Sequence, residues 1–195
     1  MKFENTREFA QGLDARDILR KYSDRFLFPI VNGKKVIYFT GNSLGLQPIN
    51  AQKYVDEIMK DWAELAVEGH FQAEKPWWDY HERFAAKLAP LVGARPSEVT
   101  VMNTLTVNLH LMMVSFYRPI GKRYKIICEE KAFPSDQYAV ASQIRFHGLE
   151  TQETLIELKP RDGEAALRTA DIVETIERNA NEIALVMMGG VNYYT

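Results

Sequence analysis

Two short polar segments, each at the start of an expected helix, could bind a phosphorylated ligand. The first is Asn103-Thr104-Leu105-Thr106, which opens a strongly apolar run that we expect to be helical. A helix start offers unpaired backbone N–H groups and the positive end of the helix dipole, and the threonines add hydroxyl groups. These groups together can hold a phosphate. The alternative is that Thr104 simply caps the helix, which is the commoner use of such a residue.

The second segment is Phe133-Pro134-Ser135-Asp136, which lies between an expected strand and an expected helix. In α/β proteins, ligands bind at the carboxyl ends of parallel strands. The ring of Phe133 could stack on a flat cofactor there, and Asp136 could accept a hydrogen bond from it. The alternative is a purely structural helix start, with a hydrophobic staple, proline in the first turn and an acid near the helix dipole.

Two further positions stand in loops that suit a small ligand. Ser43 belongs to a Gly-Asn-Ser-Leu-Gly run, whose two glycines permit a tight backbone path. His70 follows Gly69 and has aromatic neighbours at 71, 77 and 78, which suit a flat organic substrate. The other three histidines fall in or near expected helices, where packing is the commoner role.

Other familiar chemistries are not indicated. No set of His, Cys, Asp and Glu residues has a metal-ligand spacing, so we expect no metal site. The single cysteine, Cys128, lies in an expected strand, where a buried and inert thiol is the commoner state. The sequence therefore supports neither a metal centre nor a hydrolytic triad.

The composition is that of a globular protein. The 195 residues are 46% hydrophobic and 26% charged, with a net charge of −2. This near-neutral charge gives no broad attraction for nucleic acid or an anionic membrane. The longest apolar stretch, 109–116, is far shorter than the roughly 20 residues of a membrane span. With one cysteine and no secretory signal, we expect a cytoplasmic protein.

The order of elements predicts an α/β fold. Helices are expected near 15–22, 51–67, 77–92 and 105–116, with a short strand near 36–39. After Gly121, strands near 124–128, 154–158 and 183–188 alternate with helices near 135–146 and 171–180. This alternation predicts a mostly parallel sheet. We expect residues 1–60 to form an N-terminal helical and loop segment, and residues 61–195 to form the first part of a larger ligand-binding domain.

The last expected strand lies close to Thr195, the final residue of the sequence. A sheet that stopped there would expose an edge and apolar surface. We therefore expect the 195 residues to be part of a longer protein.

Six motifs occur together in one order. They are FTGNSLGLQP, AVEGH with the following PWW, MNTLTVNLHLMMVSFYRP, KRYKIICEEKAFPSDQYAVASQ, LKPRDGE and GGVNYYT. Over nearly the whole chain they resemble the kynureninase family. The resemblance implies the large domain of a fold-type-I transferase, which binds pyridoxal 5′-phosphate (PLP) and forms a homodimer. It also implies hydrolysis of L-kynurenine or 3-hydroxykynurenine to anthranilate or 3-hydroxyanthranilate and L-alanine, in tryptophan catabolism and NAD biosynthesis.

The same resemblance implies roles for the cofactor-binding candidates. Leu105 and Thr106 match the pair that holds the cofactor phosphate, and Phe133 matches the aromatic residue stacked on the pyridine ring. The remaining members of that cofactor-contacting stretch are Pro134, Ser135 and Asp136. Gly189 departs from relatives that carry a small hydroxyl residue at the matching cofactor-proximal position. One hydrogen bond to the cofactor is therefore expected to be missing.

For the substrate, Ser43 and His70 match positions that line the pocket, contributed across a dimer interface. No lysine in the sequence stands in the context of the family's Schiff-base lysine, which we expect beyond Thr195. We therefore expect no catalytic residue among the 195, and an inactive chain when it is isolated. The alternatives are another fold-type-I enzyme, such as a cysteine desulfurase or an aminotransferase, and a non-catalytic ligand-binding fragment.

Overall fold

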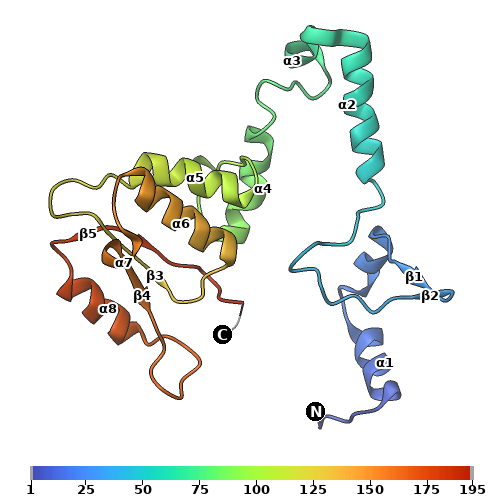
Figure 1. Cartoon of the computed structure of the whole chain (residues 1–195). Helices are drawn as coiled ribbons and strands as arrows, with labels where there is room; N and C mark the ends of the chain where they lie inside the picture. The colour runs from blue at the N-terminus through green and yellow to red at the C-terminus, as the bar shows by residue number, and fades with distance from the viewer. Residues whose placement is uncertain (1, 194–195) are drawn as a thin grey trace. The chain divides into compact units, whose positions relative to one another are not determined.

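The computed structural model describes residues 2–193 (Figure 1). Tyr194 and Thr195, at the end of the GGVNYYT motif, lie outside the described residues. The chain divides into two compact units, Met1–Arg83 and Phe84–Thr195. The boundary that we expected after residue 60 falls inside helix α2 (Ala51–Leu65), where an unbroken run of helical hydrogen bonds leaves no place for a division.

The first unit is built from short elements. In chain order they are α1 (Arg7–Arg16), the 3₁₀ turn η1 (Arg20–Arg25), β1 (Ile30–Val31), β2 (Lys34–Lys35), α2, the 3₁₀ turn η2 (Ala66–Glu68) and α3 (Gly69–Gln72). Helix α4 (Glu82–Val92) begins here and continues into the second unit. The expected helix at 51–67 is confirmed as α2, with its last residues in η2.

Three sequence-based boundaries in and near this unit are wrong. The first helix begins at Arg7, because the hydroxyl of Thr6 accepts a hydrogen bond from the N–H of Phe9 at 3.2 Å. No strand forms at 36–39; the hairpin lies just before it, around Asn32 and Gly33, whose positive φ angles of 51° and 73° suit a tight hairpin turn. The helix expected from Trp77 begins only at Glu82.

The first unit buries little apolar surface. Among residues 2–83, Ala73 is the only apolar side chain that is buried. Val55, Met59 and Trp62 recur at i, i+4 and i+7 on α2 and remain exposed. Local contacts therefore hold this unit together, above all at the corner where α2, η2 and α3 meet.

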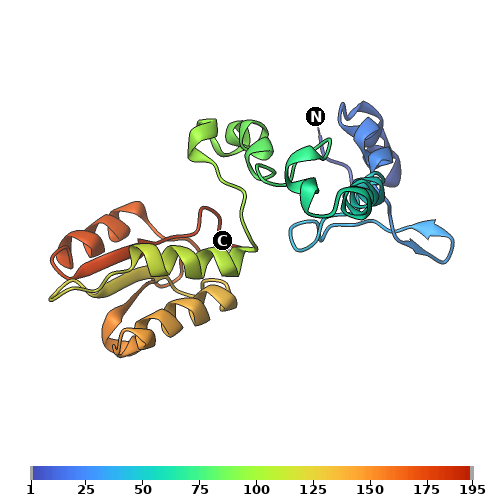
Figure 2. The ribbon, with the colours of Figure 1, turned by 90° about the horizontal axis from the view of Figure 1, so that it is seen from above.

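The second unit is a parallel sheet between two layers of helices. After α4 and the 3₁₀ turn η3 (Pro96–Glu98) come α5 (Leu105–Phe116), β3 (Lys125–Glu129), α6 (Pro134–Phe146), α7 (Thr151–Thr154), β4 (Leu155–Leu158), α8 (Thr169–Arg178) and β5 (Ile183–Met187). The strand order is β4-β3-β5, and both pairings are parallel. Helices α5 and α6 lie on one face and α8 on the other (Figures 1 and 2). The predicted α/β alternation and parallel sheet are confirmed.

The core of this unit joins α5 and α6 to the central strand. Met113 of α5 and Tyr117, the residue that follows this helix, pack with Val140 and Ile144 of α6 over Ile126 of β3. The hydroxyl of buried Tyr117 donates a hydrogen bond to the carbonyl of Tyr124 at 2.8 Å, which satisfies its polar end. These contacts anchor the two helices to the sheet. Among the described residues, no helix is both long and apolar enough to cross a bilayer.

Replacing Thr154 by valine is expected to stabilise the protein that carries this chain by about 1 kcal/mol. Thr154 is fully buried, and its hydroxyl has no hydrogen-bond partner within residues 2–193. Valine keeps the shape and removes the unpaired polar group. Urea unfolding measures the change. The matched control is Thr175→Val, which loses the 2.7 Å bond from Oγ1 to the carbonyl of Asp171 and should destabilise; a loss of stability for Thr154→Val as well would contradict the prediction.

Cys128 is expected to resist alkylation in the folded protein. Its thiol is buried in β3, and burial, together with the nearby carboxylates of Glu157 and Glu129, raises its pKa to about 11. Thiolate, the reactive form, is therefore scarce at neutral pH. Iodoacetamide at pH 7.5, followed by mass spectrometry of the peptide containing Cys128, should show modification only after unfolding in guanidinium. Rapid modification without denaturant would show that the strand opens readily.

Candidate functional site

The carboxyl edge of the sheet gathers two helix N-termini. Helices α5 and α6 run in the same direction. His110, in the middle of α5, contacts Gln143 of α6 at 3.4 Å. Further along both segments, Tyr117 meets His147 beyond the C-terminal ends, with ring centroids 5.3 Å apart. Their N-termini therefore lie at one end of the unit, where β3 and β5 also finish (Figure 1). The predicted cofactor residues 105–106, 133–136 and 189 all lie at this edge.

The N-terminus of α5 is open. Thr104 occupies the cap position in an extended conformation, but its side chain makes no capping hydrogen bond within the described part of the chain. Leu105 is 73% exposed, and Thr106 is exposed beside it. One turn on, Asn108 has a buried side-chain oxygen that lacks a partner among residues 2–193. The capping alternative is therefore not what the structure shows, and this helix end can accept an anion.

The N-terminus of α6 presents an aromatic ring and a carboxylate. Phe133 stands at the cap position and Pro134 takes the first helical position. The hydroxyl of Ser135 donates to the carboxylate of Asp136 at 3.3 Å. Phe133 is 55% exposed, and its ring meets that of Tyr193 edge to face, with centroids 5.7 Å apart. Because Phe133 is not buried, one face of its ring remains available for stacking.

Gly189 lies just after β5 and next to the side chain of Glu129. A Cβ atom on Gly189 would lie 3.0 Å from Oε1 of Glu129 and 3.4 Å from the carbonyl oxygen of Val191. Any side chain here requires Glu129 to move. Of the predicted cofactor residues, Gly189 alone lines the cavity beside this edge of the sheet.

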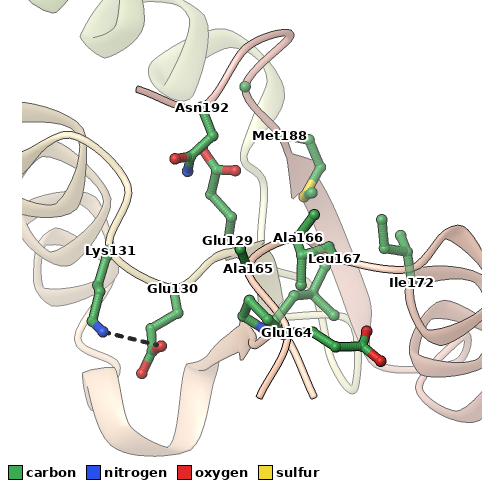
Figure 3. A pocket seen from close by; sticks show the side chains of 13 residues that line it. Glu129, Glu130, Lys131, Glu164, Ala165, Ala166, Leu167, Ile172, Met188 and Asn192 are labelled. Carbon is green, nitrogen blue, oxygen red and sulfur yellow. Dashed lines mark ion pairs between the residues drawn. The ribbon is translucent and has the colours of Figure 1, made fainter. Parts of the chain in front are cut away.

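A cavity of about 660 Å³ opens beside this edge, on the side of β4 and α8 (Figure 3). Three of its lining residues are the carboxylates Glu129, Glu130 and Glu164. Lys159 pairs with Glu130 at 2.9 Å and lowers the pKa of that carboxyl group below its usual range. Figure 3 shows Glu129 and Asn192 extending toward one another. Lys131 also lines the cavity, and Arg168 pairs with Glu164, so cations balance much of this negative charge. The N-terminus of α5 differs, because it offers backbone N–H donors that no side chain caps among the described residues.

The predicted substrate residues belong to the first unit. Ser43 is exposed in a turn, where its N–H donates to the carbonyl of Thr40 at 2.9 Å. His70 lies in the short helix α3, not in the loop that we expected, because the chain after Gly69 makes one further helical turn. Its exposed imidazole contacts the ring of Trp77 edge to face, with centroids 5.3 Å apart. Both predicted substrate residues are thus placed within the first unit.

Sequence reasoning did not single out three side chains at the carboxyl edge. They are Tyr193, Glu129 and Asn108. Glu129 is the last residue of β3, and Tyr193 follows β5. Both come directly after strands that the sequence predicts or a few residues beyond them, and this position could have identified them as site candidates. Nothing in the sequence marks the unpaired oxygen of Asn108, because it depends on packing. Within residues 2–193, no three His, Cys, Asp or Glu side chains gather as metal ligands.

No protein-family model matches the chain. Curated relatives do match, and each of the following is named kynureninase. The protein of Christiangramia forsetii is 71% identical over 195 residues, which is 100% of this chain and 46% of that protein. The Flavobacterium johnsoniae protein is 66% identical, with the same coverage. The Myxococcus xanthus protein is 61% identical over 99% of this chain and 46% of its own length.

This chain therefore spans about half the length of the curated relatives it matches. The agreement is continuous, since the alignments run over 194 or 195 residues. Along its whole length, the chain matches the N-terminal half of the kynureninases.

Proposed function

We propose that the protein carrying this chain is a PLP-dependent kynureninase. It hydrolyses L-kynurenine to anthranilate and L-alanine, or 3-hydroxykynurenine to 3-hydroxyanthranilate and L-alanine, in tryptophan catabolism and NAD biosynthesis. The observation that carries the proposal is 71% identity to a protein of that name over all 195 residues. The same identity weighs against a cysteine desulfurase or an aminotransferase. The homodimer and the fold-type-I large domain rest on the family resemblance. The cytoplasmic location rests on the sequence, which has a single cysteine.

The residues at the carboxyl edge fit the phosphate of PLP. The first-turn N–H groups of α5, the exposed hydroxyl of Thr106 and the helix dipole form a donor set without a capping side chain among the described residues. Such donors match the three acceptor oxygens of a phosphate monoester. We propose that Leu105 holds the phosphate through its backbone N–H, and Thr106 through its N–H and hydroxyl.

The N-terminus of α6 carries groups that can bind the ring of the cofactor. The half-exposed ring of Phe133 offers a stacking face, and the Asp136 carboxylate, held by Ser135 and located in the first turn of α6, offers a hydrogen-bond acceptor. Pro134 lets the helix begin directly after the stacking ring, because a first-turn proline loses no helical hydrogen bond. We propose that these residues fix the plane and the rotation of the bound cofactor.

Bound PLP supplies an electron sink for cleavage of bonds next to an amino-acid centre. In the proposed function, the residues of this chain bind and orient, and they do not transfer the reacting protons. No lysine of the sequence stands in the context of the family's cofactor-binding lysine, so we propose that these 195 residues alone do not catalyse the reaction. At Gly189 the hydroxyl found in relatives is missing, and restoring it would require Glu129 to move.

We propose that Ser43 and His70 recognise the substrate. Both side chains are exposed on the first unit, and both can form hydrogen bonds with the polar groups of kynurenine. His70 also lies among aromatic rings, which suit the aryl ketone of that substrate. This division gives cofactor binding to the second unit and part of substrate recognition to the first.

Thr106→Ala is expected to weaken PLP binding about 10-fold to 100-fold, which corresponds to the loss of one charge-assisted hydrogen bond of about 1.5–3 kcal/mol. The measurement is titration of the full-length apoenzyme with PLP, followed by absorbance. Ser115→Ala is the matched control, because Ser115 is an exposed residue near the other end of the same helix. Equal affinities in all three proteins would contradict the phosphate assignment.

His70→Ala is expected to keep the PLP spectrum and to lower kcat/KM for kynurenine. The reason is that His70 lies in the first unit, whereas the cofactor candidates lie in the second. Steady-state kinetics of the full-length enzyme, together with its absorption spectrum, test this division. A variant without bound cofactor would show that His70 has a different role, and an unchanged kcat/KM would remove it from the substrate site.

A further inference from the structure

Trp77 lies directly against Gly69 in the first unit. A Cβ atom placed on Gly69 would lie 2.6 Å from Cη2 of Trp77, 2.8 Å from Cζ2 and 2.9 Å from Cζ3. All three atoms belong to the six-membered ring of the indole. Real Cβ atoms essentially never approach other atoms so closely, and Gly69 is itself buried. The contact therefore requires glycine at position 69 for as long as tryptophan occupies position 77.

The backbone aligns the same two segments. The N–H of Trp77 faces the carbonyl of Gly69 at 3.4 Å, and the N–H of Trp78 donates to the carbonyl of His70 at 3.2 Å. These two adjacent bonds bring the chain after residue 76 back onto the start of α3. Trp77 therefore has one position relative to His70, fixed by its side chain and by its main chain.

The imidazole of His70 depends on ring packing for its orientation. It is exposed, and the contacts of its ring within residues 2–193 are with aromatic rings. Its ring contacts are with Trp77, at 5.3 Å between centroids and 79° between planes, and with the neighbouring Phe71, at 6.2 Å and 54°. An exposed side chain without such contacts samples several rotamers. The edge-to-face contact with Trp77 selects one of them.

We propose that Trp77 is the positioning residue of His70: its indole ring, seated on Gly69, holds the imidazole in the orientation that receives the substrate. The inference rests on the proposed function, in which His70 recognises kynurenine. Trp77 acts through His70 and does not touch the substrate itself. Its ring packs against Gly69 and His70, and its indole N–H is buried with no partner in the described part of the chain. The ring also lines an apolar cavity of about 500 Å³, together with Ile58, Trp62 and Tyr80.

A double-mutant cycle on the full-length enzyme separates this role from an independent one. His70→Ala, Trp77→Leu and the double variant are compared by kcat and KM for kynurenine. Trp77→Leu should lower kcat/KM by about 10-fold to 100-fold, chiefly through KM, as expected for a misplaced binding group. The double variant should be no worse than His70→Ala. If the two losses multiply, Trp77 acts independently of His70 and the proposal is wrong.

The Gly69 contact provides a second test, which begins by displacing Trp77 without replacing it. Gly69→Ala should lower kcat/KM, because its Cβ displaces the indole. Phenylalanine lacks the three indole atoms that this Cβ would meet, so Trp77→Phe should restore activity to the Gly69→Ala variant. Trp77→Phe alone is the reference variant, and the gain is measured as the ratio of kcat/KM between Gly69→Ala/Trp77→Phe and Gly69→Ala. Failure of Trp77→Phe to improve Gly69→Ala would overturn the proposal.

Proton NMR of the histidine Hε1 resonances reports on the contact without reference to activity. The His70 signal, assigned by its loss in His70→Ala, should shift in Trp77→Leu, because the ring current of the indole is removed. Trp78→Leu is the matched control, since Trp78 is 73% exposed and its ring contacts Phe71. An unmoved His70 signal in Trp77→Leu contradicts the positioning. A shifted signal together with a wild-type kcat/KM for His70→Ala refutes the substrate role and, with it, the functional part of this inference.

Discussion

Parallel pairing of β3 with strands on both sides is the constraint on which the second unit depends. Ile126 and Ile127 of β3 pair with Leu155 and Ile156 of β4, and with Leu185 and Val186 of β5. Two successive strands of a sheet can be parallel only if a crossover connects them. Helices α6 and α8 are these crossovers, and each carries the chain back to the amino-terminal ends of the strands. As a result, β3 and β5 finish at the edge where α5 and α6 begin.

This arrangement separates two electrostatic environments at one edge. The helix N-termini carry partial positive charge, and the α5 terminus has no capping side chain among the described residues. On the β4 side, the carboxylates of Glu129, Glu130 and Glu164 line the cavity. Glu130 and Glu164 are paired there with Lys159 and Arg168, so their charges are largely balanced, whereas the partial charge of the α5 terminus is not.

The first unit follows a different principle. Its helices bury almost no apolar side chains of their own, so short-range contacts fix its geometry. Ion pairs such as Lys75 with Glu57, at 2.7 Å, are half-exposed and contribute modestly. The packing of Trp77 on Gly69 is more restrictive, because it is steric and allows no alternative residue at position 69. The packing beside His70 therefore depends more on the steric fit of Trp77 against Gly69 than on attraction between charged groups.

The sequence by itself predicted the helices and strands that depend on the pattern of residues within one stretch of chain. The apolar run after Thr104 predicted α5 from Leu105 to Phe116, and the strand and helix alternation after Gly121 predicted the parallel sheet. The family resemblance suggested the roles that we propose for Thr106 and Phe133, which spacing alone had left open. Boundaries in the first unit were missed where single contacts decide them, as with the Thr6 cap of α1.

Only the tertiary structure decided which residues meet. It placed Tyr193 against Phe133 and Glu129 beside Gly189, across separations in the sequence that no periodicity encodes. It also showed that Thr104 makes no capping bond, since a capping hydrogen bond depends on the side-chain rotamer and not on residue type. Periodicity along a chain reports which face of an element is buried, whereas contacts between elements depend on how the backbone returns, and that is set by the packing of the whole unit.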